Sequence, residues 1–297
     1  MSRPTAMDSA ASSLQIADVR DPLPPLLEGI PRSGPAPRSL LVDLATSFRN
    51  PEFWTLSSWL DIVVNYRQSR LGMFWILAPA LVYIWGLGSY LVPASSSVVV
   101  YASHVALGFA IFRLVNSVIT ESTTTFTGAQ SFILDGHVCL TDFVLRVVAK
   151  ALFYFVMWMP VVASVLVFYP GLHPMGLLLA LGSMPLIVLN LLWIAVVFAL
   201  VGARFPDLSQ FISNIFIFAF LLTPITWYSN TMPPGSMRQL VMKLNPIYHM
   251  VEVVRAPILG EALQLSSLYY LAIMTAVGWL IAILVYRRYA RFVPIWI

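Results

Sequence analysis

Long uncharged runs of apolar residues alternate with short polar breaks from residue 71 onward. A run of about 20 apolar residues is long enough to cross the roughly 30 Å hydrocarbon core of a bilayer as a helix. The pattern predicts six membrane-spanning helices, at about residues 71–92, 100–119, 151–168, 175–202, 208–228 and 268–286. We therefore expect an all-α integral membrane protein whose six-helix transmembrane domain occupies residues 71–297.

The region before the first span has a different composition. Residues 1–38 are rich in Pro and Ser and lack a continuous apolar core, which predicts a disordered cytoplasmic tail. Residues 39–70 contain two amphipathic stretches; in the second, Phe53 and Leu60 share one helical face and Asp61 lies on the other. This pattern predicts an amphipathic interface helix that lies on the membrane surface.

Two segments between spans are neither long apolar runs nor simple loops. Residues 121–146 are polar enough to form a loop with a short helix of its own. Residues 236–244 and 247–259, separated by Asn245-Pro246, are too polar for full crossings and too apolar for a solvated loop. The composition of residues 236–259 therefore predicts two short re-entrant helices that dip into the outer leaflet.

The basic residues around the predicted spans give an orientation. With the N-terminus inside, the cytoplasmic side carries Arg49, Arg67, Arg70, Arg146, Lys150, Arg204, Arg287, Arg288 and Arg291. The outer side carries only Arg238, Lys243 and Arg255. Because cytoplasmic loops are enriched in Lys and Arg, both termini are predicted to be cytoplasmic.

Composition excludes several classes of function. Hydrophobic residues make up 59% of the chain and charged residues 10%, against about 25% charged in a soluble domain. The net charge of +4 comes from scattered residues without a basic face, so nucleic acid is not an expected partner. The single cysteine, Cys139, and four scattered histidines predict neither an internal disulfide nor a metal site.

The energy source must lie outside this polypeptide. The sequence has no Gly-x-x-x-x-Gly-Lys-Ser/Thr phosphate loop, so the chain is not expected to bind a nucleotide cofactor or act as an enzyme by that route. Arg113 is the sole clear ionisable residue within the predicted spans, and it has no acidic mate there, which makes a proton relay a poor fit. Three roles remain open for Arg113 on sequence alone: contact with an anionic phosphate, a position facing a water-filled path, or snorkelling of the side chain to the interface.

Several motifs occur in a consistent order. They are Tyr66-Arg-Gln-Ser-Arg-Leu-Gly-Met-Phe-Trp75 with Pro79, Arg204-Phe-Pro-Asp207, Thr223-Pro-Ile225, Asn245-Pro246, and Arg255 with Leu259-Gly260. Over about residues 40–297 this order resembles the membrane subunit of type-2 ABC exporters of the O-antigen and capsular polysaccharide group. Cys139-Leu-Thr-Asp142 departs from the family pattern, which often has a proline there, and leaves the register of the partner-contacting helix open.

The resemblance implies a set of partners. It implies a homodimer of this subunit in the bacterial inner membrane, paired with two copies of a separate ABC ATPase that binds ATP and Mg. The implied cargo is a lipid-linked polysaccharide, O-antigen first and capsule or teichoic acid polymer next. The implied pathway runs at the dimer interface between the first and fifth spans.

Two aromatic stripes are candidates for that pathway. On the first span the stripe is Trp75, Pro79, Tyr83, Gly86 and Tyr90, and on the fifth it is Ser213, Phe216, Phe220, Thr223 and Trp227. The channel candidates are Trp75, Tyr83, Tyr90, Phe216, Phe220 and Trp227, together with Arg113. Aromatic rings pack on the apolar faces of sugars. Packing between helices or an interfacial aromatic belt is the alternative.

The resemblance also suggests a coupling segment and a gate. The ATPase-coupling candidates are Phe132, Ile133, Leu134, Asp135 and His137. The gate candidates are Asn245, Pro246 and Tyr248. The alternatives are a solvated connector for the first group and a static plug or dimer contact for the second.

Two other functions remain open on sequence alone. One is efflux of a small amphiphile or drug by the same class of transporter. The other is an integral membrane enzyme acting on lipid-linked sugars, for which Asp135, His137 and Asp142 form the one cluster near an interface. Their spacing fits no metal or catalytic motif.

Overall fold

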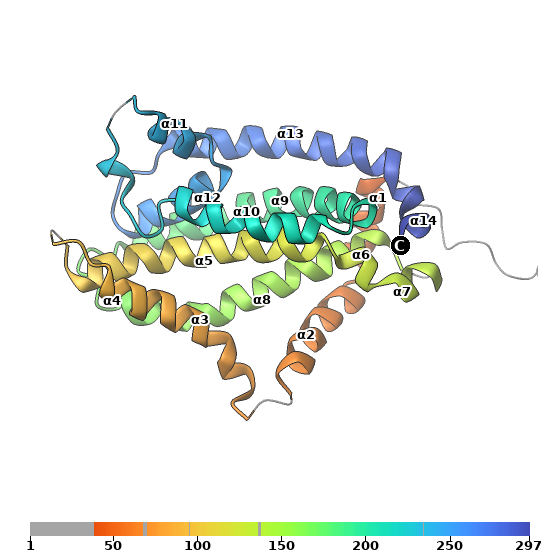
Figure 1. The fold of residues 1–297 in the computed structure, drawn as a ribbon, viewed down its shortest axis with the longest axis horizontal. Helices are drawn as coiled ribbons and strands as arrows, with labels where there is room; N and C mark the ends of the chain where they lie inside the picture. Colours follow the sequence, from red (N-terminus) through yellow and green to blue (C-terminus); the bar gives the residue numbers. More distant parts are fainter. Residues whose placement is uncertain (1–38, 68–69, 95, 136–137, 234) are drawn as a thin grey trace, which may run out of the picture.

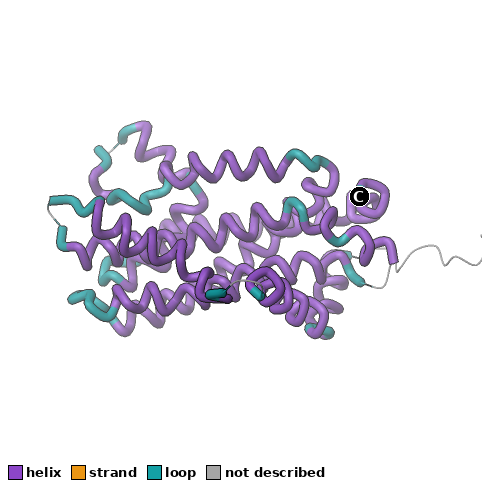
Figure 2. Tube along the Cα trace, turned by 60° about the horizontal axis from the view of Figure 1, so that its bottom comes forward, coloured by secondary structure: helices purple, strands orange, loops and turns teal. Residues whose placement is uncertain are grey.

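The computed structural model describes residues 39–67, 70–94, 96–135, 138–233 and 235–297. The predicted tail, residues 1–38, lies outside the described residues. Within the described ranges all regular secondary structure is helical, as Figure 2 shows. The prediction of an all-α protein is therefore confirmed for this part of the chain.

Five segments are long and apolar enough to cross a membrane, so the protein has the character of a multi-pass membrane protein. They are the broken first span Gly72–Tyr90, α5 (Val98–Ser122), α8 (Leu140–Leu166), α9 (Pro174–Arg204) and the C-terminal segment Leu265–Trp296, which contains α13 (Leu265–Tyr289). Most of these helices run along the long axis of the molecule, with α5 central and almost wholly buried (Figure 1). The fifth predicted span, residues 208–228, corresponds to α10 (Leu208–Leu222), which has only 15 residues.

The first span is not one regular helix. It passes from a 3-10 segment (Gly72–Ile76) through α3 (Leu77–Leu81) and a π-helical segment (Val82–Leu87) to α4 (Gly88–Tyr90). Pro79 has no N–H with which to continue the α-helical ladder, and this accounts for a break near that residue. The span was predicted, but its irregular path was not.

The predicted loop at residues 121–146 is largely helical, so that prediction was wrong in detail. Besides the ends of α5 and α8, it contains α6 (Thr125–Gly128) and α7 (Gln130–Asp135). The side chain of Asp142 accepts a hydrogen bond from the Cys139 N–H at 3.1 Å and so caps the early start of α8. Charged residues on α5 and α8 interrupt the apolar pattern of the sequence. In the structure two of them, Lys150 of α8 and Glu121 of α5, form an ion pair.

The two amphipathic helices before the first span are confirmed as α1 (Leu40–Arg49) and α2 (Glu52–Tyr66). The buried residues of α2 are Ser58 and Ile62, and Asp61 receives two hydrogen bonds from Arg146 of α8, at 2.6 and 2.8 Å. The polar face of α2 thus packs on α8, whereas Leu60 is exposed. This arrangement leaves an apolar face of α2 directed away from the protein.

Within the described residues, five short helical elements lie before and after α13 in the last part of the chain. α11 (Met237–Leu244) and α12 (Pro246–Ile258) confirm that the polar segment forms two short helices. A 3-10 turn (Ser229–Thr231) precedes α11, and a second 3-10 turn (Ala290–Phe292) leads into α14 (Val293–Trp296). In Figure 1, α7 and α14 lie at one end of the molecule, while α4 and α11 lie at the other.

Candidate functional site

An aromatic groove lies between the first span, α5 and α10. Its volume is about 450 Å³. Tyr83 stacks on Phe109 of α5, with ring centroids 4.3 Å apart, and Phe220 of α10 meets Tyr83 edge to face at 5.9 Å. Phe112 joins the group through contacts with Phe216 and Phe220, at 5.8 and 5.3 Å. We call this set, Tyr83, Phe109, Phe112, Phe216 and Phe220, the aromatic cluster.

A polar groove of about 400 Å³ continues from the aromatic cluster toward the last turns of α5. The two grooves share Arg113, Asn116 and Ser213, so they form one continuous surface. The other residues that line the polar groove carry hydroxyl or carboxylate groups: Ser117, Thr120, Glu121, Thr124 and Ser209. The continuous surface therefore changes from aromatic rings to hydrogen-bonding groups along its length.

Arg113 stands at the junction of the two grooves. Its guanidinium carbon lies 5.5 Å from the ring centroid of Trp158, within cation–π distance. Its Nε atom is buried and has no hydrogen-bond partner among the described residues. Because Arg113 lines both grooves, a side chain that faces a path fits this geometry better than one that snorkels to the interface.

The structure brings together four of the seven channel candidates: Tyr83, Phe216, Phe220 and Arg113. Trp75 and Tyr90 do not line the groove and are 52% and 87% exposed. The predicted stripe assumes an α-helix of about 3.6 residues per turn, whereas 3-10 turns contain about 3.0 and π turns are wider. Pro79 and Tyr83, four residues apart, both line the groove, but the spacing does not carry the face on to Trp75 or Tyr90.

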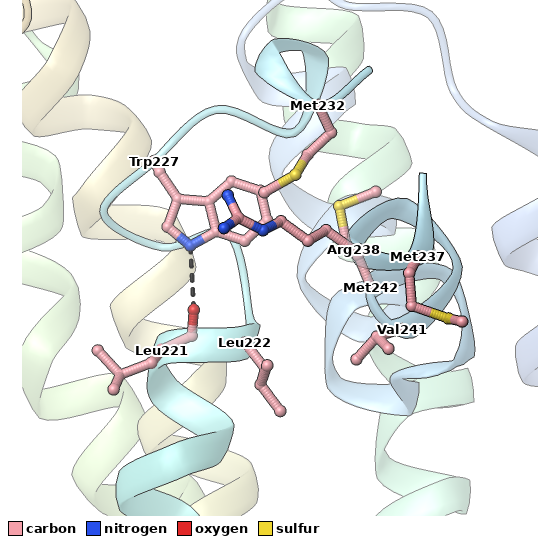
Figure 3. A pocket seen from close by; sticks show the side chains of 8 residues that line it. All are labelled: Leu221, Leu222, Trp227, Met232, Met237, Arg238, Val241 and Met242. Atoms are coloured by element: carbon pink, nitrogen blue, oxygen red, sulfur yellow. Dashed lines mark hydrogen bonds between the residues drawn. The ribbon is translucent and has the colours of Figure 1, made fainter. Parts of the chain in front are cut away.

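Trp227 also lies outside the aromatic groove. α10 ends at Leu222 because Pro224 disfavours the helical conformation at the preceding residue, Thr223. The indole N–H of Trp227 donates to the Leu221 carbonyl oxygen at 3.1 Å, at the edge of a different groove of about 370 Å³ (Figure 3). That groove faces α11 and is lined by Leu221, Leu222, Trp227, Met232, Met237, Arg238, Val241 and Met242.

Two of the three gate candidates connect α12 to the end of α10. The Asn245 amide donates to the Thr223 hydroxyl at 2.9 Å, and its carbonyl oxygen accepts the Ile247 N–H at 2.9 Å, with Pro246 at the first position of α12. Tyr248 is only 3% exposed and packs against His249. The Tyr248 side chain is thus buried within its own subunit, and its role at a gate stays a prediction.

His249 fastens α12 to its neighbours. Its ring nitrogens contact the Lys243 carbonyl oxygen at 2.8 Å and the Ser267 hydroxyl at 2.9 Å. Burial lowers the pKa of His249, and a neutral imidazole can donate to the carbonyl while it accepts from the hydroxyl. The histidine thereby links α11, α12 and the start of α13.

Sequence reasoning missed a buried charge network next to the aromatic cluster. Arg255 is 2% exposed, and it donates to Glu252 at 2.7 Å and to the Pro224 carbonyl oxygen at 2.5 Å. One guanidinium nitrogen also lies 3.1 Å from Nε2 of His104 on α5. The burial of Arg255 was not predicted, and its place on the outer side of the membrane stays a prediction. Glu252, three residues before Arg255 in an apolar helix, was the available signal.

The network holds the segment after α10 in place. The Tyr101 hydroxyl donates to the Thr226 carbonyl oxygen at 2.7 Å, and His104 lies 3.2 Å from that of Trp227. Together with Arg255, these residues fix the non-helical backbone that follows the aromatic cluster. Backbone polar groups at such a place need internal partners, and α5 and α12 supply them.

The coupling candidates lie on α7. Phe132 and Leu134 are 51% and 55% exposed, Asp135 is also exposed, and Ile133 is buried. His137 lies outside the described residues. α7 therefore presents two apolar side chains at one end of the molecule, which is a feature of protein contact surfaces.

Neither a protein-family model nor a curated protein matches this chain. The fold and the grooves define it as a multi-pass, all-α membrane protein.

Proposed function

We propose that this chain is the permease subunit of an ATP-driven exporter that carries lipid-linked polysaccharide, O-antigen in the first instance, across the bacterial inner membrane. The observation that carries the proposal is the continuous groove, in which an aromatic cluster leads into a row of hydroxyl-bearing side chains. Pyranose rings have apolar faces that pack on aromatic rings and hydroxyl groups that need polar partners. Weak contacts of both kinds allow a polymer to slide.

The proposed topology has six crossings, with both termini in the cytoplasm. α10 spans about 22 Å at 1.5 Å per residue, and the non-helical segment after Leu222 completes the fifth crossing. Exposed apolar residues along α10, such as Phe211, Ile217 and Phe218, suit contact with lipid or a second subunit. α11 and α12 dip into the outer leaflet, and their contact with the end of α10 makes them candidates for an exit gate.

The proposed assembly contains two copies of this subunit and two copies of a separate ATPase that binds ATP and Mg. Two subunits that face each other through the first span and α10 enclose the open side of the aromatic groove. Phe132 and Leu134 of α7 supply the apolar contact with the ATPase. In this assembly ATP hydrolysis on the partner changes the spacing of the two subunits and so opens the path.

Deletion of the gene, followed by measurement of surface polysaccharide and by affinity purification of the tagged protein, tests the proposal. We expect loss of surface polymer, accumulation of lipid-linked polymer inside the cell and copurification of an ATPase. Unchanged surface polymer together with increased sensitivity to small amphiphiles would indicate that the protein exports drugs and not polysaccharide. Loss of the lipid-linked sugar itself, instead of its accumulation, would indicate an enzyme that makes it.

A further inference from the structure

A third groove, of about 570 Å³, lies at the end of α9 and α13, away from the aromatic cluster. α9 contributes Leu200, Val201 and Arg204, and the C-terminal segment contributes Tyr289, Phe292 and Trp296. Its volume is within the range of about 300–1,000 Å³ that is typical of ligand sites. We call it the C-terminal groove.

Aromatic rings and one cation shape the C-terminal groove. The guanidinium carbon of Arg204 lies 5.2 Å from the ring centroid of Trp296. Trp296 stacks on Phe292, with centroids 5.9 Å apart, and approaches Tyr289 at 6.1 Å. Arg204 forms no ion pair with Asp207 within the described ranges, although the sequence allows one. Its charge is thus directed to an aromatic rim and not to a carboxylate.

Three more arginines surround the groove, and none of them forms an ion pair among the described residues. Arg287 and Arg288 end α13, and Arg291 follows on the next turn. The guanidinium carbons of Arg288 and Arg291 lie 5.8 and 4.7 Å from the rings of Tyr289 and Phe292. In the part of the chain that the structure covers, the ion pairs involve Arg146, Lys150 and Arg255, and none of these four arginines. This end of the bundle therefore favours an anion.

The position of the groove limits the kind of anion. α9 and α13 pack against each other and are long apolar spans, so the groove lies where the hydrocarbon region ends and the polar headgroups begin. Aromatic side chains and arginines are favoured at this depth. Basic pockets between helices at such a boundary suit the phosphates of acidic lipids, whose acyl chains pack on apolar helix surfaces.

We propose that the C-terminal groove binds an anionic glycerophospholipid of the adjacent leaflet. Arg204 binds the headgroup phosphate, Trp296 and Tyr289 flank the glycerol region, and Leu200 and Val201 contact the acyl chains. This site is independent of the cargo proposed above. The lipid site can be tested separately from the cargo, because it depends only on the ends of two spans and not on the aromatic groove.

Native mass spectrometry of the full-length protein, released from nanodiscs that contain equal amounts of phosphatidylglycerol and phosphatidylcholine, tests the proposal. We expect retained phosphatidylglycerol, and about fivefold less of it in Arg204→Gln, because one basic side chain near a lipid surface contributes about 1 kcal/mol. Arg204→Lys should retain most of the lipid, and Trp296→Ala should lose it. Arg238→Gln, an exposed arginine near the opposite end, is the matched control and should retain it.

Three results would overturn the proposal. The first is equal retention of the two lipids, and the second is unchanged retention of phosphatidylglycerol in Arg204→Gln. The third is displacement of the lipid by millimolar inorganic phosphate, which would mean that a free anion and not a lipid is the ligand. The groove would instead bind a protein partner if a copurified protein covers Trp296 in lipid-free detergent and if lipid retention does not depend on Arg204.

Discussion

The ring of Phe220 on α10 meets the ring of Tyr83 on the first span edge to face, with centroids 5.9 Å apart and planes inclined by 70°. These two residues belong to the two helices that the sequence resemblance places on either side of a transport path. Their contact, and the stacking of Tyr83 on Phe109, make the aromatic wall of the groove one packed unit. In the proposed topology the last turns of α5 are cytoplasmic, so an exported polymer meets the hydroxyl groups first and the ring faces afterwards.

Removal of either ring is expected to impair export. Tyr83→Ala and Phe220→Ala should each lower the rate at which long polymer reaches the surface about three- to tenfold, in line with about 0.5–1.5 kcal/mol for one aromatic contact. Pulse labelling of surface polysaccharide measures this rate. Tyr269→Ala, on an exposed aromatic of α13, is the control and should leave export unchanged. Normal export in both groove variants, at normal expression, would show that the aromatic cluster does not line the path.

The buried pair of Arg255 and Glu252 predicts a large effect on stability. Arg255→Met leaves a buried carboxylate without its partner and removes a donor from the Pro224 carbonyl oxygen, and breaking such a pair costs about 3–5 kcal/mol. We expect a clear fall in the apparent melting temperature in detergent, measured by size-exclusion chromatography after heating. The double variant Glu252→Gln/Arg255→Met should recover part of the loss, and Arg238→Met should change little. Equal melting temperatures for Arg255→Met and the parent protein would contradict this account.

Two glycines of α9 give a matched test of helix packing. A methyl group at Gly202 would overlap the carbonyl oxygen of Thr123, whereas a methyl group at Gly182 would meet no atom within 4 Å. Gly202→Ala should therefore destabilise the protein by about 1–3 kcal/mol through overpacking. Gly182→Ala should be neutral or stabilising by up to about 1 kcal/mol, because Ala is a better helix former. Thermal unfolding in the same detergent compares them, and equal effects would show that α9 does not approach Thr123 closely.

The exposed apolar side chains of α7 predict a contact with the ATPase. The double variant Phe132→Ser/Leu134→Ser should lower the apparent affinity about tenfold or more, since one buried anchor residue commonly contributes over about 1 kcal/mol to an interface. Copurification at a series of ATPase concentrations measures the change. Met237→Ser removes an apolar side chain that is even more exposed, on α11 at the opposite end, and should have no effect. Full binding by the double variant would place the coupling contact elsewhere.

Hydrophobic patterning predicted the helical class, the approximate places of the long helices and the break at Asn245-Pro246. These features depend on local composition, which the sequence states directly. The start of α8 at Leu140 was missed because Arg146 and Lys150 interrupt the apolar run, and their partners Asp61 and Glu121 lie on other helices. Pairing between distant charges is not visible in a local pattern.

The candidate site was predicted in part, for a related reason. Phe216 and Phe220 lie on the regular helix α10, and Tyr83 lies near the start of the π-helical segment, directly after α3, so helical spacing placed all three in one groove. Trp75 lies within the 3-10 segment, Tyr90 lies after the π-helical segment, and Trp227 lies after the end of α10. Spacing arguments fail across such changes of geometry. The burial of Arg255 was not predicted because a charge between predicted spans suggests exposure, and only the packing of α12 shows that it is buried.

The central claim is that this chain provides a lined path and that a separate subunit provides the energy. Proteoliposomes that contain the purified protein, with and without its copurifying ATPase, can be loaded with lipid-linked polymer and assayed for polymer that crosses to the opposite face. The account predicts crossing only when both the ATPase and hydrolysable ATP are present, and slower crossing with Tyr83→Ala. Crossing at the full rate by this chain alone, without a nucleotide-hydrolysing partner, would contradict it.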